Sequence, residues 1–148
     1  MRRKLRRVFS LPRGDWKIIG EAWWKLLAAD LLLRARPFPG VERLVSRRFR
    51  AGVAGDPQQD LNTIAHLQPL VATASHHHLY PMTCLRQALA LQDMLGRRGL
   101  HAQLRIGVRK EAGNLQAHTW LEFQGQTIEV ERPRDEHLAA FIPMEISR

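Results

Sequence analysis

The single cysteine of this chain lies in the stretch Pro81-Met82-Thr83-Cys84-Leu85-Arg86-Gln87-Ala88-Leu89-Ala90-Leu91-Gln92-Asp93-Met94-Leu95. Apolar residues recur within it at helical spacing, which predicts a helix from Cys84 to about Arg98. Thr83 or Met82 precedes this helix as its cap, so Cys84 is expected in the first turn. That position matters because the N-terminus of a helix favours a negatively charged group.

The periodicity of the sequence changes from helical to strand-like across this stretch. Before it, we expect helices over residues 16–34, 41–49 and 61–75. Pro69 should kink or divide the last of them. After Gly99, alternating apolar residues predict antiparallel strands over residues 101–108, 115–123 and 126–131. This order of elements predicts an α+β fold.

The chain is expected to form one domain, residues 15–148, after a basic arm, residues 1–14. Asp15 is expected to cap the first helix. That helix is rich in tryptophan, which fits packing against the domain or, as the less favoured alternative, binding to a membrane surface. Residues 135–148 are expected to be a tail with an apolar patch.

The formal net charge of +9 is concentrated in two arginine-rich clusters, within residues 2–7 and 43–50. Such clusters attract phosphates, anionic lipids or acidic peptides, and a solvated basic surface explains them equally well. The aromatic residues do not interleave with the arginines, so nucleic acid is not an expected partner. A lone cysteine excludes an internal disulfide framework and favours a reducing, cytoplasmic location.

Several other classes of protein are disfavoured by the sequence. No stretch approaches the roughly 18 consecutive apolar residues of a membrane-spanning helix. The run His76-His77-His78 has no cysteine or carboxylate set at ligand spacing, so we expect no metal site. We also find no phosphate-binding loop, and we expect that this chain binds no cofactor.

Cys84 and His118 have the sequence form of a thiol nucleophile with its base. A helix N-terminus lowers the pKa of a thiol, and its backbone N–H groups are suited to bind an oxyanion. A histidine within reach would hold the proton as part of a thiolate–imidazolium pair. The competing interpretation is a small buried thiol and an ordinary strand histidine, which is more common for either residue alone.

The predicted hairpin places carboxylates near the histidine. A two-residue turn at Gln124-Gly125 pairs His118 with Glu131 and Trp120 with Glu129. This face either packs on the cysteine-bearing helix, as an active site would, or faces solvent with the other face as core. By strand alternation the polar face carries His118, Trp120, Glu122, Glu129 and Glu131, and the apolar face carries Thr119, Leu121, Phe123, Ile128 and Val130.

At these residues the chain resembles the transglutaminase-like leader peptidases of lasso peptide biosynthesis, the B-type maturation proteases. The resemblance covers roughly residues 15–145. Its motifs are Cys84-Leu85-Arg86-Gln87-Ala88-Leu89-Ala90-Leu91, Leu95-Gly96-Arg97-Arg98-Gly99-Leu100, Leu104-Arg105-Ile106-Gly107-Val108-Arg109-Lys110, Ala117-His118-Thr119-Trp120-Leu121-Glu122 and Gly125. It implies a papain/transglutaminase-like cysteine protease fold with a Cys-His-Asp triad.

Within that family pattern, Cys84 falls on the nucleophile and His118 on the base. The aspartate of the family falls at Val130, which is flanked by Glu129 and Glu131. The pairing argument favours Glu131 as the third member, and Glu129 remains the alternative.

The resemblance also implies a function. The enzyme would remove the leader from a ribosomally made precursor, whose freed amine an ATP-dependent macrolactam synthetase would then join to an acidic side chain. Expected partners are the leader region of the precursor, a separate leader-recognition protein and the synthetase, through which any ATP requirement would act. The alternatives are a transglutaminase-like amidase or acyltransferase with the same triad, and a non-catalytic basic binding module.

Overall fold

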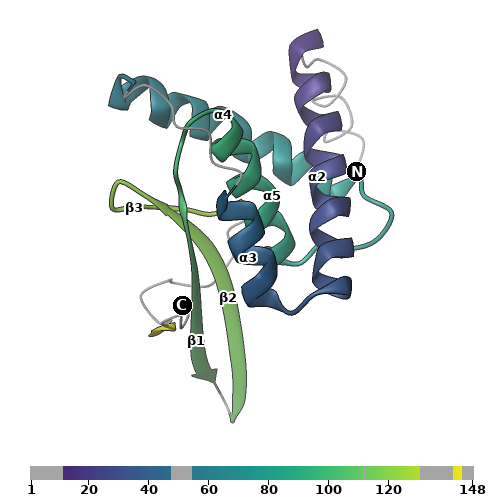
Figure 1. Ribbon diagram of the computed structural model, residues 1–148, viewed down its shortest axis with the longest axis vertical. Helices are drawn as coiled ribbons and strands as arrows, with labels where there is room; N and C mark the ends of the chain where they lie inside the picture. The colour runs from purple at the N-terminus through teal and green to yellow at the C-terminus, as the bar shows by residue number, and fades with distance from the viewer. Residues whose placement is uncertain (1–11, 48–54, 112, 131–141, 145–148) are drawn as a thin grey trace.

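The computed structural model describes residues 12–47, 55–111, 113–130 and 142–144. Four helices precede a small antiparallel sheet (Figure 1), which confirms the predicted α+β fold. The helices are α2 (Arg13–Ala35), α3 (Phe38–Arg47), α4 (Pro57–His76) and α5 (Cys84–Arg97). The strands are β1 (Gln103–Glu111), β2 (Asn114–Phe123), β3 (Gln126–Ile128) and β4 (Ile142–Met144).

The helix that carries the cysteine lies at the centre of the fold. It contacts α2, α3 and α4, and it also packs on β2 and β1. Every residue from Gln87 to Gly96 is buried, so the helix is enclosed on all sides beyond its first turn. A central helix of this kind fixes the position of its own N-terminus, where Cys84 lies.

The start of α2 differs from the prediction. The helix begins at Arg13, and Asp15 is a buried residue of its first turn rather than its cap. The Asp15 carboxylate lies 3.0 Å from the Nε2 atom of His66 on α4. A carboxylate in the first turn still complements the helix dipole. The prediction that Asp15 caps the helix is therefore wrong, and residues 1–11 of the predicted arm lie outside the described residues.

The tryptophan-rich helix α2 packs on the rest of the domain, as the favoured prediction had it. Ala22, Leu26 and Ala29 are buried on the side that meets α4 and α5. Trp24 and Leu31 are exposed on the outer side. Within the part of the chain that the structure describes, no helix is both long and apolar enough to cross a membrane.

Helix α4 begins with a strong local signal. The side chain of Asp56 accepts a hydrogen bond from the backbone N–H of Gln58 at 3.1 Å, and Pro57 occupies the first position. Pro69 lies inside the helix without dividing it, because α4 is continuous from Pro57 to His76. The Thr73 hydroxyl donates to the Pro69 carbonyl at 2.8 Å one turn later.

The sheet has the strand order β3-β2-β1-β4. Phe123 pairs with Gln126, which confirms the predicted hairpin register. Gln124 and Gly125 both have positive φ angles, 49° and 76°, as a tight two-residue hairpin turn requires. Two predictions about strands are wrong: β3 ends at Ile128 rather than at residue 131, and residues 142–144, expected to lie in a tail, form β4 beside β1.

Candidate active site

Cys84 is the first residue of α5, with Thr83 as the N-cap residue, as predicted. The Thr83 side chain makes no capping hydrogen bond, and its hydroxyl accepts instead from Nη1 of Arg86 at 3.2 Å. The first helical hydrogen bond runs from the Gln87 N–H to the Thr83 carbonyl at 3.1 Å. The backbone N–H groups ahead of Gln87 therefore stand beside the thiol, which is itself partly exposed.

His118 lies in the middle of β2, opposite Gly107 of β1. Side chains opposite each other on neighbouring strands share one face, so the missing side chain of Gly107 leaves room for the imidazole. The ring of His118 stacks on Trp120 at a centroid distance of 6.2 Å. Only 8% of the His118 side chain is exposed. The ring is therefore held in one place by the sheet.

Glu129 supplies the carboxylate that meets this histidine. Its Oε1 atom lies 2.8 Å from Nε2 of His118, and its side chain is 8% exposed. Because Glu129 occupies Nε2, Nδ1 is the ring nitrogen left to face the thiol. Glu129 was the alternative carboxylate from the sequence, and the preferred Glu131 lies outside the described residues.

The electrostatics of the two reactive groups favour a thiolate–imidazolium pair. Hydrogen bonding to His118 lowers the pKa of Cys84 below its ordinary 9.0, against the opposing effect of burial, with Thr119 adding to the shift. The same bond raises the pKa of His118 above its ordinary 6.5, and the hydrogen bond to Glu129 reinforces this. Each group thus stabilises the charged form of the other.

Both faces of β2 are buried where the site forms. Leu121 and Phe123 on the apolar face belong to the core. On the polar face, His118 and Trp120 are 6% and 7% exposed, so this face does not simply point to solvent. A small pocket beside the thiol is lined by Cys84, Gln87, Ala88, Thr119, Trp120, Leu121, Ile128 and Val130. The apolar face is therefore core, and the polar face is also buried at His118 and Trp120 instead of facing solvent.

Gln87 anchors the segment that leads into the nucleophile, a role that the sequence analysis missed. Its side-chain amide donates to the Ser75 hydroxyl at 2.8 Å and to the Met82 carbonyl at 3.1 Å. Gln87 is only 3% exposed. The available signal was a polar residue on the apolar side of the helix, one turn after Cys84.

A second anchor fastens the same segment to α2. Asp30 is fully buried and accepts a hydrogen bond from the Tyr80 hydroxyl and one from Nε of Arg34 at 2.8 Å. Nε of Arg86, on the first turn of α5, forms an ion pair with Asp30 at 2.7 Å. Asp30 therefore joins three parts of the chain around the start of α5.

The three adjacent histidines form no metal centre with other residues in the described ranges, where no group of three or more potential ligands occurs. His78 stacks on Trp23 at a centroid distance of 4.5 Å and also contacts Tyr80 edge to face. Its ring is thus part of the packing between α2 and the segment before Cys84.

Comparison with known proteins identifies a family that covers most of the chain. A family model described as the transglutaminase-like superfamily matches residues 26–144. This range runs from α2 through β4, and it includes Cys84, His118 and Glu129. Comparisons with curated proteins and with solved structures gave no significant match.

Proposed function

This chain belongs to the transglutaminase-like superfamily, a group of generally cysteine-dependent enzymes, and we propose that it is the leader peptidase of a lasso peptide pathway. In this proposal Cys84 is the nucleophile, His118 the base and Glu129 the residue that orients the base. The observation that supports a cysteine-dependent enzyme is the thiol at the helix start, whose hydrogen bond to His118 continues to Glu129. The choice of a leader peptidase rests on the sequence resemblance.

The first half of the proposed reaction is acylation. The Cys84 thiolate attacks the carbonyl carbon of the scissile peptide bond, and the His118 imidazolium donates its proton to the departing amine. The amine leaves as the new N-terminus of the core peptide. The C-terminal acyl group of the leader remains on the sulfur as a thioester.

The second half is hydrolysis of that thioester. Neutral His118 takes a proton from water, whose oxygen attacks the thioester carbonyl. The C–S bond breaks and restores the Cys84 thiolate, His118 keeps the proton as the imidazolium, and the leader departs as a carboxylic acid that loses its proton to solvent. Glu129 holds the ring orientation in both halves and stabilises the imidazolium form.

The start of α5 offers backbone N–H groups that would bind the oxyanion formed in acylation and again in hydrolysis. The Thr83 hydroxyl binds Arg86 instead of capping the helix, so it does not occupy the N–H groups beside Cys84. Backbone N–H groups at such a position stabilise a developing oxyanion, typically by about 3–4 kcal/mol for one donor.

The proposal extends to partners and location. We propose that a separate leader-recognition protein presents the precursor and that the macrolactam synthetase receives the freed amine. Any need for ATP belongs to that synthetase, and the chain itself works without a bound cofactor. The expected location is the cytoplasm, where such a thiol stays reduced.

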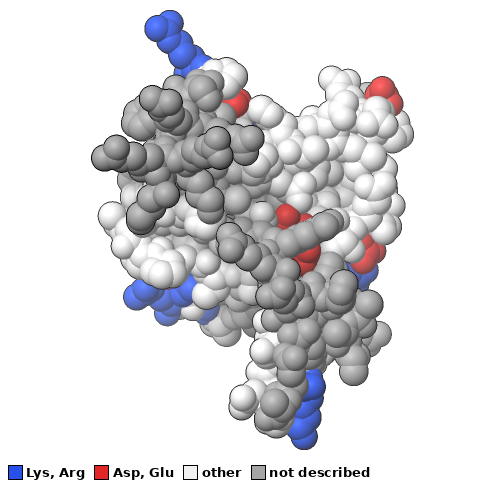
Figure 2. Space-filling view, turned by 180° about the vertical axis from the view of Figure 1, so that it is seen from behind, with Lys and Arg blue, Asp and Glu red and all other residues white. Residues whose placement is uncertain are grey.

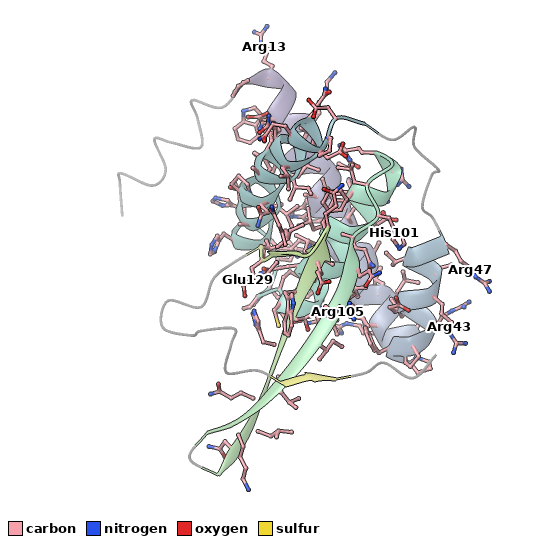
Figure 3. The ribbon with its side chains drawn as sticks, turned by 90° about the vertical axis from the view of Figure 1, so that its left-hand side faces the viewer. Arg13, Arg43, Arg47, His101, Arg105 and Glu129 are labelled. Atoms are coloured by element: carbon pink, nitrogen blue, oxygen red, sulfur yellow. The ribbon has the colours of Figure 1, made fainter. Side chains whose placement is uncertain are left out.

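A transglutaminase-like acyltransferase is the second candidate, because the same thioester accepts an amine as readily as water. A basic binding module is the remaining alternative, and its arginines within residues 2–7 and 48–50 lie outside the described residues. On the face in Figure 2, described Lys and Arg atoms lie toward the edges, and acidic atoms lie near the middle and at the upper and right-hand edges. Among the described residues, Arg43 and Arg47 of α3 project on the same side (Figure 3).

The test is a reconstituted reaction of precursor, recognition protein, synthetase and this chain in water labelled with ¹⁸O. Hydrolysis places one ¹⁸O atom in the leader carboxylate, as mass spectrometry of the leader would report. With an added primary amine, a transferase would instead give an amide without the label. Cys84→Ala should abolish cleavage, and a Cys84→Ala variant that still matured the precursor would exclude the proposal.

A further inference from the structure

Gln68 on α4 makes a contact with the site that neither the sequence motifs nor the triad assignment includes. Its side-chain Nε2 donates to the backbone carbonyl oxygen of Glu129 at 2.6 Å. The two residues are 61 positions apart in the sequence. We infer that Gln68 is a positioning residue, which holds Glu129 so that its carboxylate meets Nε2 of His118.

The need for such a contact follows from where the hairpin ends. The last pair of the β2–β3 ladder is Leu121 with Ile128, so Glu129 lies one residue beyond it. A residue inside the ladder is positioned by its cross-strand partner, whereas Glu129 follows the last pair. The Gln68 amide adds a contact at this position, to the backbone from which the Glu129 side chain reaches His118.

The contact also ties the carboxylate to the frame that holds the nucleophile. Helix α4, which carries Gln68, packs against α5, and its Ser75 accepts the hydrogen bond from Gln87. Gln87 in turn holds the Met82 carbonyl just before Cys84. The Gln68 amide therefore ties Glu129 to α4, and the Gln87 amide ties the residue before Thr83 to α5 and α4. The carboxylate and the nucleophile are thus both linked to the packed pair α4 and α5.

The inference rests on the proposed roles of Cys84, His118 and Glu129, and it makes a specific prediction about them. Without the Gln68 amide, the Glu129 carboxylate is less well held at the imidazole. The imidazolium is then less stabilised, and the thiolate that depends on it is less stabilised as well. Displacement of a group that orients a catalytic residue typically lowers kcat by about 10- to 100-fold.

The test compares Gln68→Met, which keeps the length of the side chain and removes the donor, with Gln68→Asn, which withdraws the amide by one methylene. Gln58→Met is the matched control, because among the described residues the Gln58 side-chain amide donates to Asn62 of the same helix, at 3.3 Å. Three measurements are made: the pH dependence of Cys84 alkylation by iodoacetamide, the low-field proton signal of His118 Nε2–H in NMR spectra, and kcat for leader removal.

Both Gln68 variants should move the alkylation midpoint to higher pH, weaken the His118 signal and lower kcat more than they change KM, while Gln58→Met should match the wild type. Since Gln68 is only partly buried, its replacement should leave the fold intact. Unchanged alkylation and NMR signals in both variants would overturn the inference. These two measurements need no peptide, so a shifted midpoint without leader cleavage would reject the proposed substrate and leave the role of Gln68 standing.

Discussion

Glu129 lies one residue beyond the last paired residue of β3, yet its Oε1 atom is 2.8 Å from Nε2 of His118 in the middle of β2. The strand register alone would place Glu129 opposite Trp120, beside the histidine rather than against it. The ladder ends at Ile128, and the carboxylate that meets the ring comes from the next residue.

The pH dependence of the thiol is the most direct prediction. The pKa of Cys84 is lowered from 9.0 and that of His118 is raised from 6.5. These opposite shifts bring the two pKa values toward each other and favour the thiolate–imidazolium pair. The rate of leader removal should rise on the acid side as the thiolate forms and fall on the alkaline side as His118 loses its proton.

Alkylation by iodoacetamide checks this without a substrate. The alkylation midpoint of wild-type Cys84 should lie below pH 9.0, and His118→Ala should move it up toward that ordinary value. Equal midpoints for the two proteins would show that His118 does not ionise the thiol.

Replacement of Glu129 by Gln should lower kcat by about 10³- to 10⁴-fold, because the amide favours the wrong tautomer of His118. Glu122→Gln is the control, since Glu122 lies on the same strand face and pairs with Arg105 at 3.4 Å on the surface. Glu131→Gln completes the series. If Glu131→Gln were the more damaging change, the role of third member would pass from Glu129 to Glu131.

The substitution Thr83→Asp should raise the stability of the fold and lower the activity. An aspartate at this position would accept hydrogen bonds from backbone N–H groups of the first turn of α5, with which the Thr83 side chain makes no cap hydrogen bond. Such a cap stabilises a helix by about 1 kcal/mol. Its charge would also raise the pKa of the adjacent thiol and compete with the oxyanion. We expect a higher Tm and a lower kcat, measured on the same preparation.

Thr83→Ala provides the comparison for that variant. Since the Thr83 side chain makes no cap hydrogen bond, its removal should change Tm little. A large loss of Tm in Thr83→Ala would contradict the cap geometry.

Asp30→Asn should destabilise the fold without removing a catalytic group. Asp30 is fully buried and binds Tyr80, Arg34 and Arg86. Because Arg34 is 64% exposed and water screens its charge, we expect a loss of about 1–3 kcal/mol in the free energy of unfolding. Denaturant titration of the two proteins measures this difference.

The same residue predicts how stability depends on pH. The Tyr80 hydrogen bond, followed by the two arginines, holds the pKa of Asp30 below its ordinary 3.8. Its contribution to stability is therefore fully present above pH 3.8 and is lost as the pH falls through the lower folded value. Asp30→Asn should lack this part of the acid transition, and an identical acid profile for both proteins would reject the role of Asp30.

Local features of the sequence were enough to predict the start of α5 and the register of the β2–β3 hairpin. The start of α5 at Cys84 follows from Thr83 and the apolar spacing after it, which act within a few residues. The hairpin register follows from the tight turn at Gln124-Gly125, which fixes every pair up to Ile128. These two local signals placed the thiol at a helix N-terminus and the histidine on the adjacent sheet.

Other features depend on contacts between distant parts of the chain. Strand β4 is only three residues long and carries no period of its own, and it exists because β1 offers an edge for pairing. The predicted cap at Asp15 is wrong because the helix begins at Arg13, so Asp15 lies in the first turn, where its carboxylate meets His66 of α4. Local propensity contains neither of these contacts.

The sequence by itself therefore determined the fold class, the position of Cys84 in its helix and the position of His118 in its hairpin. The tertiary structure showed that Glu129 meets the histidine, a contact that lies beyond the last pair of the β2–β3 ladder. It also brought Gln68, 61 residues away in the chain, to the backbone carbonyl of Glu129. A contact across that separation exists only once the helices have packed.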